Sequence, residues 1–217
     1  MHVESGELLP EGHPFSAASK ESLHWALILK ILEGDERTKP FGGVNQTFAM
    51  MDKKMRTYEE FNQKYPGYGW FLPWYYITNG TIGPDKGWYD RVPSLDNGQL
   101  FWAAYVVLYR LKESYPNAPY NLTARMQVMI DAMIKYTPLI FYEGQGKVRA
   151  VAYMTDMTKP VEENTYWHQG CDPWCYLDDP YEGELITFIL YLLSDLPEAD
   201  QQALWQVKRA KLQRVEF

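Results

Sequence analysis

Cysteine is scarce in this chain, whose 217 residues include only Cys171 and Cys175. A structural zinc site needs four ligands, and near these cysteines only His168, with Asp172 as a further candidate, could complete one. The cysteines also lack the basic surroundings that activate a catalytic thiol. Their C-x-x-x-C spacing therefore favours a small disulfide loop, which forms in an oxidising compartment, over zinc or thiol chemistry.

Long apolar runs and basic clusters are missing as well. No window reaches the roughly 18 apolar residues of a membrane span, and the start, M-H-V-E-S-G-E, lacks the apolar core of a signal peptide. The net charge is −7. One group of basic residues stands near the C-terminus (Lys208, Arg209, Lys211 and Arg214), where it suits the last turn of a helix. Neither a membrane nor nucleic acid is an expected partner.

Several signatures of cofactor and nucleophile chemistry are also absent. The sequence contains no P-loop, no G-x-G-x-x-G, no G-x-S-x-G elbow and no H-E-x-x-H helix. These patterns mark phosphate-binding loops, dinucleotide sites, serine hydrolases and zinc proteases respectively. Chemistry carried by carboxylates and sugar-binding aromatic side chains fits the composition better.

Aromatic residues, by contrast, are abundant at 16% of the chain, with 8 Trp, 17 Tyr and 9 Phe. Many stand beside Gly, Pro and Asp in two long loops, 65–93 and 156–180, rather than in helical stripes. Loops of this length inside a compact domain are usually functional. Rings placed there either stack on the apolar faces of sugars or pack beneath the loops. The candidates for lining a sugar-binding cleft are Trp70, Trp74, Trp88, Tyr166 and Trp174.

Helical periodicity dominates the remainder of the chain. We expect helices at 19–34, 44–64, 95–114, 121–140, 181–194 and 198–213. A turn at 142–147 and alternation over 148–154 predict one short β-hairpin. Residues 1–18 form an irregular N-terminal segment and 19–217 one helical domain. The helices pair into hairpins, and in a ring of such hairpins the long loops would share one face. The rhythm is typical of about half of an (α/α) barrel.

Four carboxylates crowd into one short segment, D-D-P-Y-E-G-E: Asp178, Asp179, Glu182 and Glu184. Crowding raises carboxylate pKa values, and such a cluster serves a metal, proton transfer or a solvated helix start. The aromatic neighbours favour proton transfer on a sugar. On a helix, residues two apart point roughly 200° apart, so Glu182 and Glu184 cannot share one pocket. Glu182, next to Gly183, is the favoured proton donor.

Other polar residues border the aromatic loops. Asp96 and Asn97 stand where the first loop enters a helix, which suits a helix cap or contacts to a bound hydroxyl. His168 lies in the second loop, where it could contact substrate, act as a base or make one structural hydrogen bond. Asp96, Asp179 and Glu184 are candidates for a polar subsite or for a second carboxylate.

Three N-x-T glycosylation acceptors occur, at Asn45, Asn79 and Asn121. Average residue frequencies give about one such site by chance in a chain of this length. Because these acceptors are modified in proteins that enter the secretory pathway, the three together indicate a secreted glycoprotein.

Three motifs together resemble one known family. They are P-G-Y-G-W-F-L-P-W at 66–74, V-P-S-L-D-N-G-Q-L-F-W-A at 92–103 and D-D-P-Y-E-G-E-L at 178–185. In these motifs the chain is similar, over about residues 19–217, to the endo-β-1,2-glucanases of fungal type. The middle and last motifs are the more specific ones.

The resemblance implies a mainly α fold, an (α/α)6-barrel-like helical toroid, and hydrolysis of β-1,2-glucan with inversion. It implies that Glu182 is the general acid and that no cofactor is needed. Inversion requires a second carboxylate as base, expected from the other half of the barrel. With about half of the helices, the chain would expose an apolar face, so a partner chain or a missing half is expected. The alternative is a non-catalytic carbohydrate-binding protein on the same scaffold. A polysaccharide lyase is disfavoured because the candidate cleft is acidic.

Overall fold

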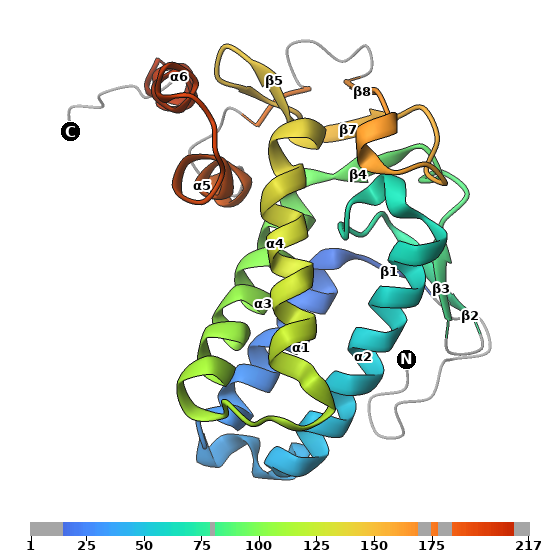
Figure 1. Ribbon diagram of the computed structural model, residues 1–217, viewed down its shortest axis with the longest axis vertical. Coiled ribbons are helices and arrows are strands. Elements are labelled where there is room, and N and C mark those ends of the chain that lie inside the picture. The colour runs from blue at the N-terminus through green and yellow to red at the C-terminus, as the bar shows by residue number, and fades with distance from the viewer. Residues whose placement is uncertain (1–14, 79–80, 169–174, 178–183, 211–217) are drawn as a thin grey trace, which may run out of the picture.

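Four long helices form the body of the part of the chain that the structure describes: α1 (Ala18–Leu32), α2 (Val44–Lys64), α3 (Ser94–Ser114) and α4 (Leu122–Phe141). They run along the long axis of this computed structural model, which describes residues 15–78, 81–168, 175–177 and 184–210 (Figure 1). The shorter α5 (Glu184–Leu192) and α6 (Glu198–Arg209) are seen nearly end-on beside α4. The predicted helices are confirmed to within a few residues where described, so the mainly helical class is correct.

Apolar spacing explains why these segments are helical and which side each one buries. In α2 the predicted stripe recurs every three or four residues, and all its members are buried: Phe48, Met51, Met55, Tyr58 and Phe61. α1 packs mainly against α3, and α4 contacts both α2 and α3. One hydrophobic core therefore lies between the four helices. None of the described helices combines the length and apolarity that a bilayer span needs.

Long and short connections lie at opposite ends of the helices. The α1–α2 connection contains the short helix η1 (Glu36–Phe41), and the α3–α4 connection contains η3 (Pro119–Asn121). The connections after α2 and α4 are long, and both leave from the upper end in Figure 1. They contain the one-turn helices η2 (Pro66–Tyr68) and η4 (Val161–Glu163). The expectation that the two long aromatic loops share one face is confirmed.

Strands are more numerous than predicted. In the described residues, β1 (Phe15–Ser16), β2 (Tyr75–Thr78) and β3 (Thr81–Pro84) form one antiparallel sheet. A second contains β4 (Arg91–Pro93), β7 (Val151–Met154) and β8 (Tyr166–Trp167), and β5 (Tyr142–Gly144) pairs with β6 (Lys147–Val148). The prediction of a single hairpin was wrong. The missed signal is Asn-Gly at 79–80, a typical two-residue hairpin turn, between the paired residues Thr78 and Thr81.

The two long connections are bonded to each other. β4 of the first pairs with β7 of the second, with Val92 opposite Ala152. The Gly67 N–H donates to the Met157 carbonyl over 2.9 Å, and the Tyr166 hydroxyl donates to the Gly67 carbonyl over 2.6 Å. A Cβ on Gly67 would lie 2.9 Å from the Asp156 carbonyl oxygen. Any larger residue at position 67 would therefore push the two loops apart. The loops thus form one interlocked layer.

A buried carboxylate ties the first of these loops to the helices. Glu21 of α1 accepts hydrogen bonds from Lys54 and the Tyr58 hydroxyl of α2 and from the Tyr75 hydroxyl of β2. Burial raises the pKa of Glu21, but the charge of Lys54 and these hydrogen bonds together lower it below the ordinary 4.5. The ionised carboxylate therefore stabilises the folded state.

Replacing Glu21 with glutamine should lower the free energy of unfolding by about 2 kcal/mol at pH 7, because Lys54 loses its partner in a largely buried place. A depressed carboxyl pKa contributes stability that is complete above the unfolded pKa and is lost as the pH falls below it. The difference between wild type and Glu21→Gln should therefore shrink below pH 4.5. Urea unfolding across pH measures this. The exposed Glu60→Gln on α2 is the control, and a pH-independent difference would contradict the assignment.

Candidate functional site

The interlocked loops carry a pair of stacked indole rings. Trp74 and Trp88 have ring centroids 4.6 Å apart at an interplanar angle of 30°. Trp74 is 38% exposed, and its Nε1 donates to Asp96 Oδ2 over 2.9 Å. Phe15 packs edge-on against Trp74. Three predicted site residues thus form one unit, here called the Trp74 platform (Trp74, Trp88 and Asp96), in which a partly exposed indole stands beside a carboxylate.

Asp96 is not a helix cap, contrary to one of its expected roles. α3 begins at Ser94 after Pro93, with no side-chain cap. Asp96 lies in the first turn, where its charge complements the helix dipole, and its Oδ2 is held by Trp74. The helix start was misplaced because the backbone N–H of Ser94 is satisfied by the Ala150 carbonyl of the second loop, a contact that only the tertiary structure supplies.

Asn97 does not face a substrate, and that prediction was wrong. Its side chain is completely buried. Its Oδ1 accepts from the Leu72 N–H over 2.8 Å, while Nδ2 donates to the carbonyls of Leu72 and Pro93 over 2.8 and 2.7 Å. The Asn97 side chain therefore bonds both backbone groups of Leu72, as a neighbouring strand would. Because Leu72 stands two residues before Trp74, Asn97 positions the platform from its buried side.

Trp70 and Tyr166 have mainly structural contacts. Trp70 is half-buried against the core at a positive φ of 71°, and its N–H donates to Asn62 Oδ1 over 3.0 Å. The Tyr166 hydroxyl donates to the Gly67 carbonyl, and burial raises the pKa of Tyr166. Tyr166 thus joins the two loops and Trp70 packs on the core, as expected for aromatic residues that pack beneath long loops.

A charged cluster surrounds His168. Its Nδ1 lies 2.8 Å from Glu143 Oε2, and Tyr176 donates its hydroxyl to Glu143 Oε1 over 2.9 Å. Arg149 Nε donates to Oε2 over 3.1 Å, while its Nη1 donates to the Ile140 carbonyl. The structure therefore gives His168 a carboxylate partner that the sequence did not reveal. Glu143 follows Tyr142 in a turn-like segment, where no spacing marked it as a partner of residues beyond it.

The environment of Glu143 keeps it ionised. Burial raises its pKa, but hydrogen bonds from His168 and Tyr176 and the charge of Arg149 outweigh that effect and lower the pKa below its usual range. A carboxylate with three donors around it is a weak base. The cluster is therefore better suited to fixing His168 and Tyr176 beside β5 than to removing a proton from water.

Most of the acidic segment lies outside the described residues, and the structure describes only the residues on either side of it. Asp179, Glu182, Trp174 and Cys171 lie outside the described residues, as does Asn79. Glu184 begins α5, and its side chain is also outside the description. Cys175 is disulfide-bonded, and Cys171 is the only other cysteine of the sequence.

The borders of that segment are fixed next to the predicted site. The Leu177 N–H donates to the Val148 carbonyl over 2.8 Å, and the Ala150 N–H donates to the Cys175 carbonyl over 2.7 Å. On the other side, Trp102 Nε1 of α3 donates to the Leu185 carbonyl over 2.8 Å. One border of the segment carrying Glu182 is thus held by Val148 and Ala150 of the second loop, and the other by α3, the helix that carries Asp96.

Gly98 allows α5 to approach α3 this closely. A Cβ at Gly98 would lie 2.8 Å from the Leu185 Cβ and 3.1 Å from the Ile186 backbone nitrogen. Because the added methyl group would overlap Leu185, Gly98→Ala should displace the start of α5 and lower the free energy of unfolding by about 2 kcal/mol. Urea unfolding measures the effect. Gly87→Ala, where the nearest atom lies 3.9 Å from the added Cβ, is the matched control; equal stability of the two variants would show that α5 can shift at no cost.

Two of the glycosylation candidates are described. Asn45 in the first turn of α2 and Asn121 immediately before α4 are both exposed. The Thr47 hydroxyl of the first acceptor donates to the Gly43 carbonyl and is buried. Modification of these asparagines stays a prediction. Across the described ranges, no group of three or more His, Cys, Asp or Glu side chains is arranged to hold a metal ion.

Comparison with known proteins places the chain in a family. The family model described as endo-beta-1,2-glucanase SGL matches residues 1–217. The chain belongs to this family. It is similar to the endo-beta-1,2-glucanase from Talaromyces funiculosus in complex with sophorose, at 38% identity and a TM-score of 0.85. The match covers 94% of this chain and 42% of that one.

A second solved structure gives the same correspondence. It is a glutamate-to-glutamine mutant of the Talaromyces funiculosus enzyme with beta-1,2-glucan, at 37% identity and a TM-score of 0.85, and the match again covers 94% of this chain and 42% of that one. The chain therefore spans less than half the length of the solved endo-beta-1,2-glucanase structures that it matches. No match is found among curated proteins. The resemblance inferred from the three motifs is confirmed.

Proposed function

We propose that this chain acts on β-1,2-glucan as part of an inverting endo-β-1,2-glucanase. The observation that carries the proposal is the family match over the whole chain. The two similar structures are described as complexes with sophorose and with beta-1,2-glucan. Because the chain spans 42% of their length, the activity is inferred for this chain together with whatever completes the site.

In this proposal Glu182 protonates the glycosidic oxygen as the bond to the leaving sugar breaks. The Trp74 platform would hold a sugar ring on its exposed indole face, with Asp96 accepting from a hydroxyl. Asp179, Glu184 and Trp174 remain candidate substrate contacts. That a glutamate-to-glutamine mutant of a similar enzyme was obtained with beta-1,2-glucan agrees with a glutamate in a chemical role. Proton transfer and positioning suffice, so no cofactor is proposed.

The general base is proposed to come from the other half of the barrel, with Asp96 as the alternative among the described carboxylates. An inverting enzyme needs a carboxylate that activates a water on the opposite face of the sugar, about 6.5–9.5 Å from the acid. Asp96 is engaged by Trp74 Nε1, and Glu143 is stabilised in its ionised form by Arg149 and its neighbours. Glu143 is therefore poorly suited to accept a proton from water, and Asp96 is the described candidate for the alternative.

The four long helices are proposed to be part of an (α/α)6 barrel that further helices, in the same or a second chain, complete. The solved relatives are longer. Large apolar side chains on the outer faces of α3, α4 and α5 are at least 41% exposed: Val106, Tyr109, Val128, Leu139 and Leu192. Monomers rarely leave such surface in water. Light scattering should therefore show self-association, and a strictly monomeric, soluble chain would oppose the proposal.

Secretion and glycosylation are proposed from the acceptors at Asn45, Asn79 and Asn121. The exposure of Asn45 and Asn121 and the disulfide at Cys175 support an oxidising, secretory environment. Removal of N-glycans from protein expressed in a fungal host should lower its mass; an unchanged mass would show that the acceptors are unused.

The activity is tested by incubating the purified chain with linear β-1,2-glucan and following reducing ends, with β-1,3-glucan as the control substrate. Inversion predicts that the first product carries an α-configured reducing end, visible by NMR before mutarotation. Binding without product formation would instead indicate a carbohydrate-binding protein, and product formation with a retained β-configuration would contradict the inverting mechanism.

A further inference from the structure

A row of three side chains crosses the sheet formed by β4, β7 and β8. Arg91 on β4 is the direct partner of Tyr153 on β7, and Tyr153 is the direct partner of Trp167 on β8. Directly opposed residues of neighbouring strands point to the same face of a sheet. Arg91, Tyr153 and Trp167 are therefore called the ladder.

Contacts within the ladder fix its side chains. The Arg91 guanidinium lies over the Tyr153 ring, 4.5 Å from its centroid, and Arg91 Nη1 donates to the Tyr153 hydroxyl over 2.9 Å. The rings of Tyr153 and Trp167 are stacked at 27°, with centroids 6.2 Å apart. These side chains are held in place before any ligand arrives, which lowers the entropy cost of binding.

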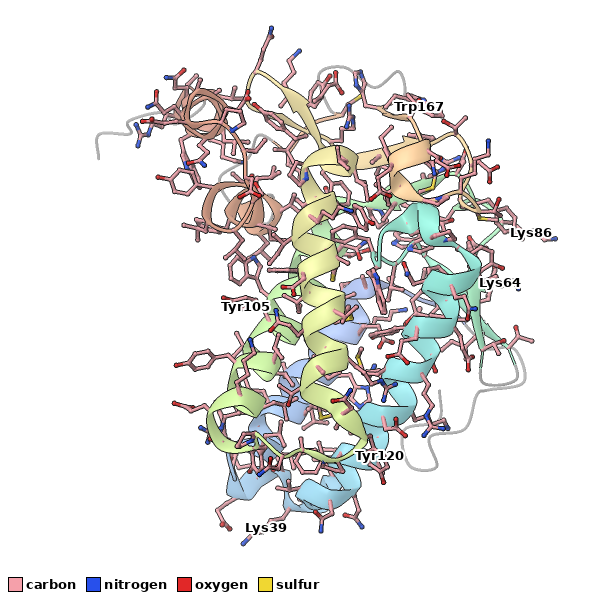
Figure 2. All side chains as sticks on the ribbon, viewed as in Figure 1. Lys39, Lys64, Lys86, Tyr105, Tyr120 and Trp167 are labelled. Atoms are coloured by element: carbon pink, nitrogen blue, oxygen red, sulfur yellow. The ribbon has the colours of Figure 1, made fainter. Side chains whose placement is uncertain are left out.

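The ladder is on the face of the sheet that the core does not use. Val92, Ala152 and Met154, the alternate residues of β4 and β7, are buried in the core. Trp167 is 40% exposed, and Figure 2 shows it at the end of the molecule that carries the long loops. Packing of the core explains why Val92, Ala152 and Met154 are apolar. It does not explain why an ordered indole is exposed on the opposite face.

The ladder is continuous with the candidate site. β4 leads from Arg91 directly into α3 and Asp96, and Trp167 is followed by His168 of the charged cluster. Asp90, whose carbonyl accepts from the Met154 N–H, pairs with Arg91 Nε over 2.9 Å. The ladder thus presents the Trp167 ring at one edge of the sheet and, beyond Tyr153, an ion pair without net charge that can donate to and accept from sugar hydroxyls.

We propose that the ladder is an additional binding site for a neutral β-glucan chain, in which a glucosyl ring beyond those at the cleavage site stacks on Trp167. The Arg91–Asp90 pair, on the other side of Tyr153, would hydrogen-bond hydroxyls of a neighbouring glucosyl unit. The flat ring favours a sugar face, and the balanced charge disfavours an anionic polymer. The identity of the glucan as β-1,2-linked depends on the proposed function, whereas the location of the site does not.

The test is affinity electrophoresis of the full chain in gels containing long-chain β-1,2-glucan. Trp167→Ala should bind about tenfold more weakly than wild type, the loss expected for one aromatic stacking contact. Phe41→Ala, which removes a 62%-exposed aromatic side chain from η1, is the matched control and should migrate as wild type. Equal retardation of Trp167→Ala and wild type, or no retardation of wild type, would overturn the proposal.

A second variant and a second substrate separate the possible failures. Trp167→Leu keeps apolar bulk against Tyr153 and should retain the wild-type melting temperature while losing the stacking surface, so weaker binding by this variant cannot be attributed to unfolding. Turnover of a β-1,2-oligosaccharide too short to reach the ladder should be unchanged in both variants. A large loss of that turnover would place Trp167 at the cleavage site and overturn the proposal of an additional binding site. Retardation without any hydrolysis by wild type would reject the proposed function and leave the ladder standing.

Discussion

Glu182→Gln should reduce hydrolysis of β-1,2-glucan about a thousandfold while leaving binding of the polymer nearly unchanged. A positioned general acid contributes roughly 10²–10⁴ in rate, and glutamine has the same shape but cannot give up a proton. Of the described borders of its segment, Leu177 is bonded to Val148 of β6 and Leu185 to Trp102 of α3. Initial rates of reducing-end release, compared with affinity electrophoresis of the same variant, separate chemistry from binding.

The choice of leaving group tests the proton-donor role directly. An aryl β-sophoroside with an acidic phenol leaves without protonation, so Glu182→Gln should lose far less activity on it than on glucan. Glu163→Gln, an exposed glutamate of η4 on the second loop, is the matched control and should be unaffected on both substrates. An equal loss on both substrates would assign Glu182 to binding or folding instead.

Asn97→Ala should lower the free energy of unfolding by about 4 kcal/mol. The substitution removes three hydrogen bonds in a completely buried place and leaves the N–H and C=O of Leu72 and the carbonyl of Pro93 without these partners. Each such loss costs about 1–3 kcal/mol. For a chain of this size, the melting temperature should fall by roughly 10 °C. Thermal unfolding followed by circular dichroism measures the change.

The same substitution should loosen the Trp74 platform, because Leu72 stands two residues before Trp74. Trp74 fluorescence should therefore shift toward that of a water-exposed indole even below the melting temperature. The exposed Asn117→Ala, in the turn before α4, removes the same side chain without buried partners and should change stability by less than about 0.5 kcal/mol. A stable Asn97→Ala would mean that water replaces the lost hydrogen bonds.

Asn97 and Glu143 show where reading the sequence was insufficient. Asp96 and Asn97 are adjacent and similar in polarity, yet one is at the platform and the other is buried behind it. Neighbouring residues on a helix point about 100° apart, and which of them faces outward depends on where Leu72 and Pro93 lie. Glu143 carried no motif, since its partners His168 and Tyr176 are 25 and 33 residues away.

By itself, the sequence determined the helices, the exclusion of P-loop and dinucleotide motifs and the family, because periodicity is local and the three motifs are contiguous. The α2 stripe belongs to this part, whereas the pairing of Trp74 with Asp96, 22 residues apart, is a tertiary contact that no sequence pattern indicated. Tertiary structure alone decided the sheets, the interlocking of the two long loops, the His168–Glu143 pair and the ladder. Those features depend on backbone hydrogen bonds and charges between segments far apart in the chain, and their partners become visible only when the helices bring the two loops to the same end.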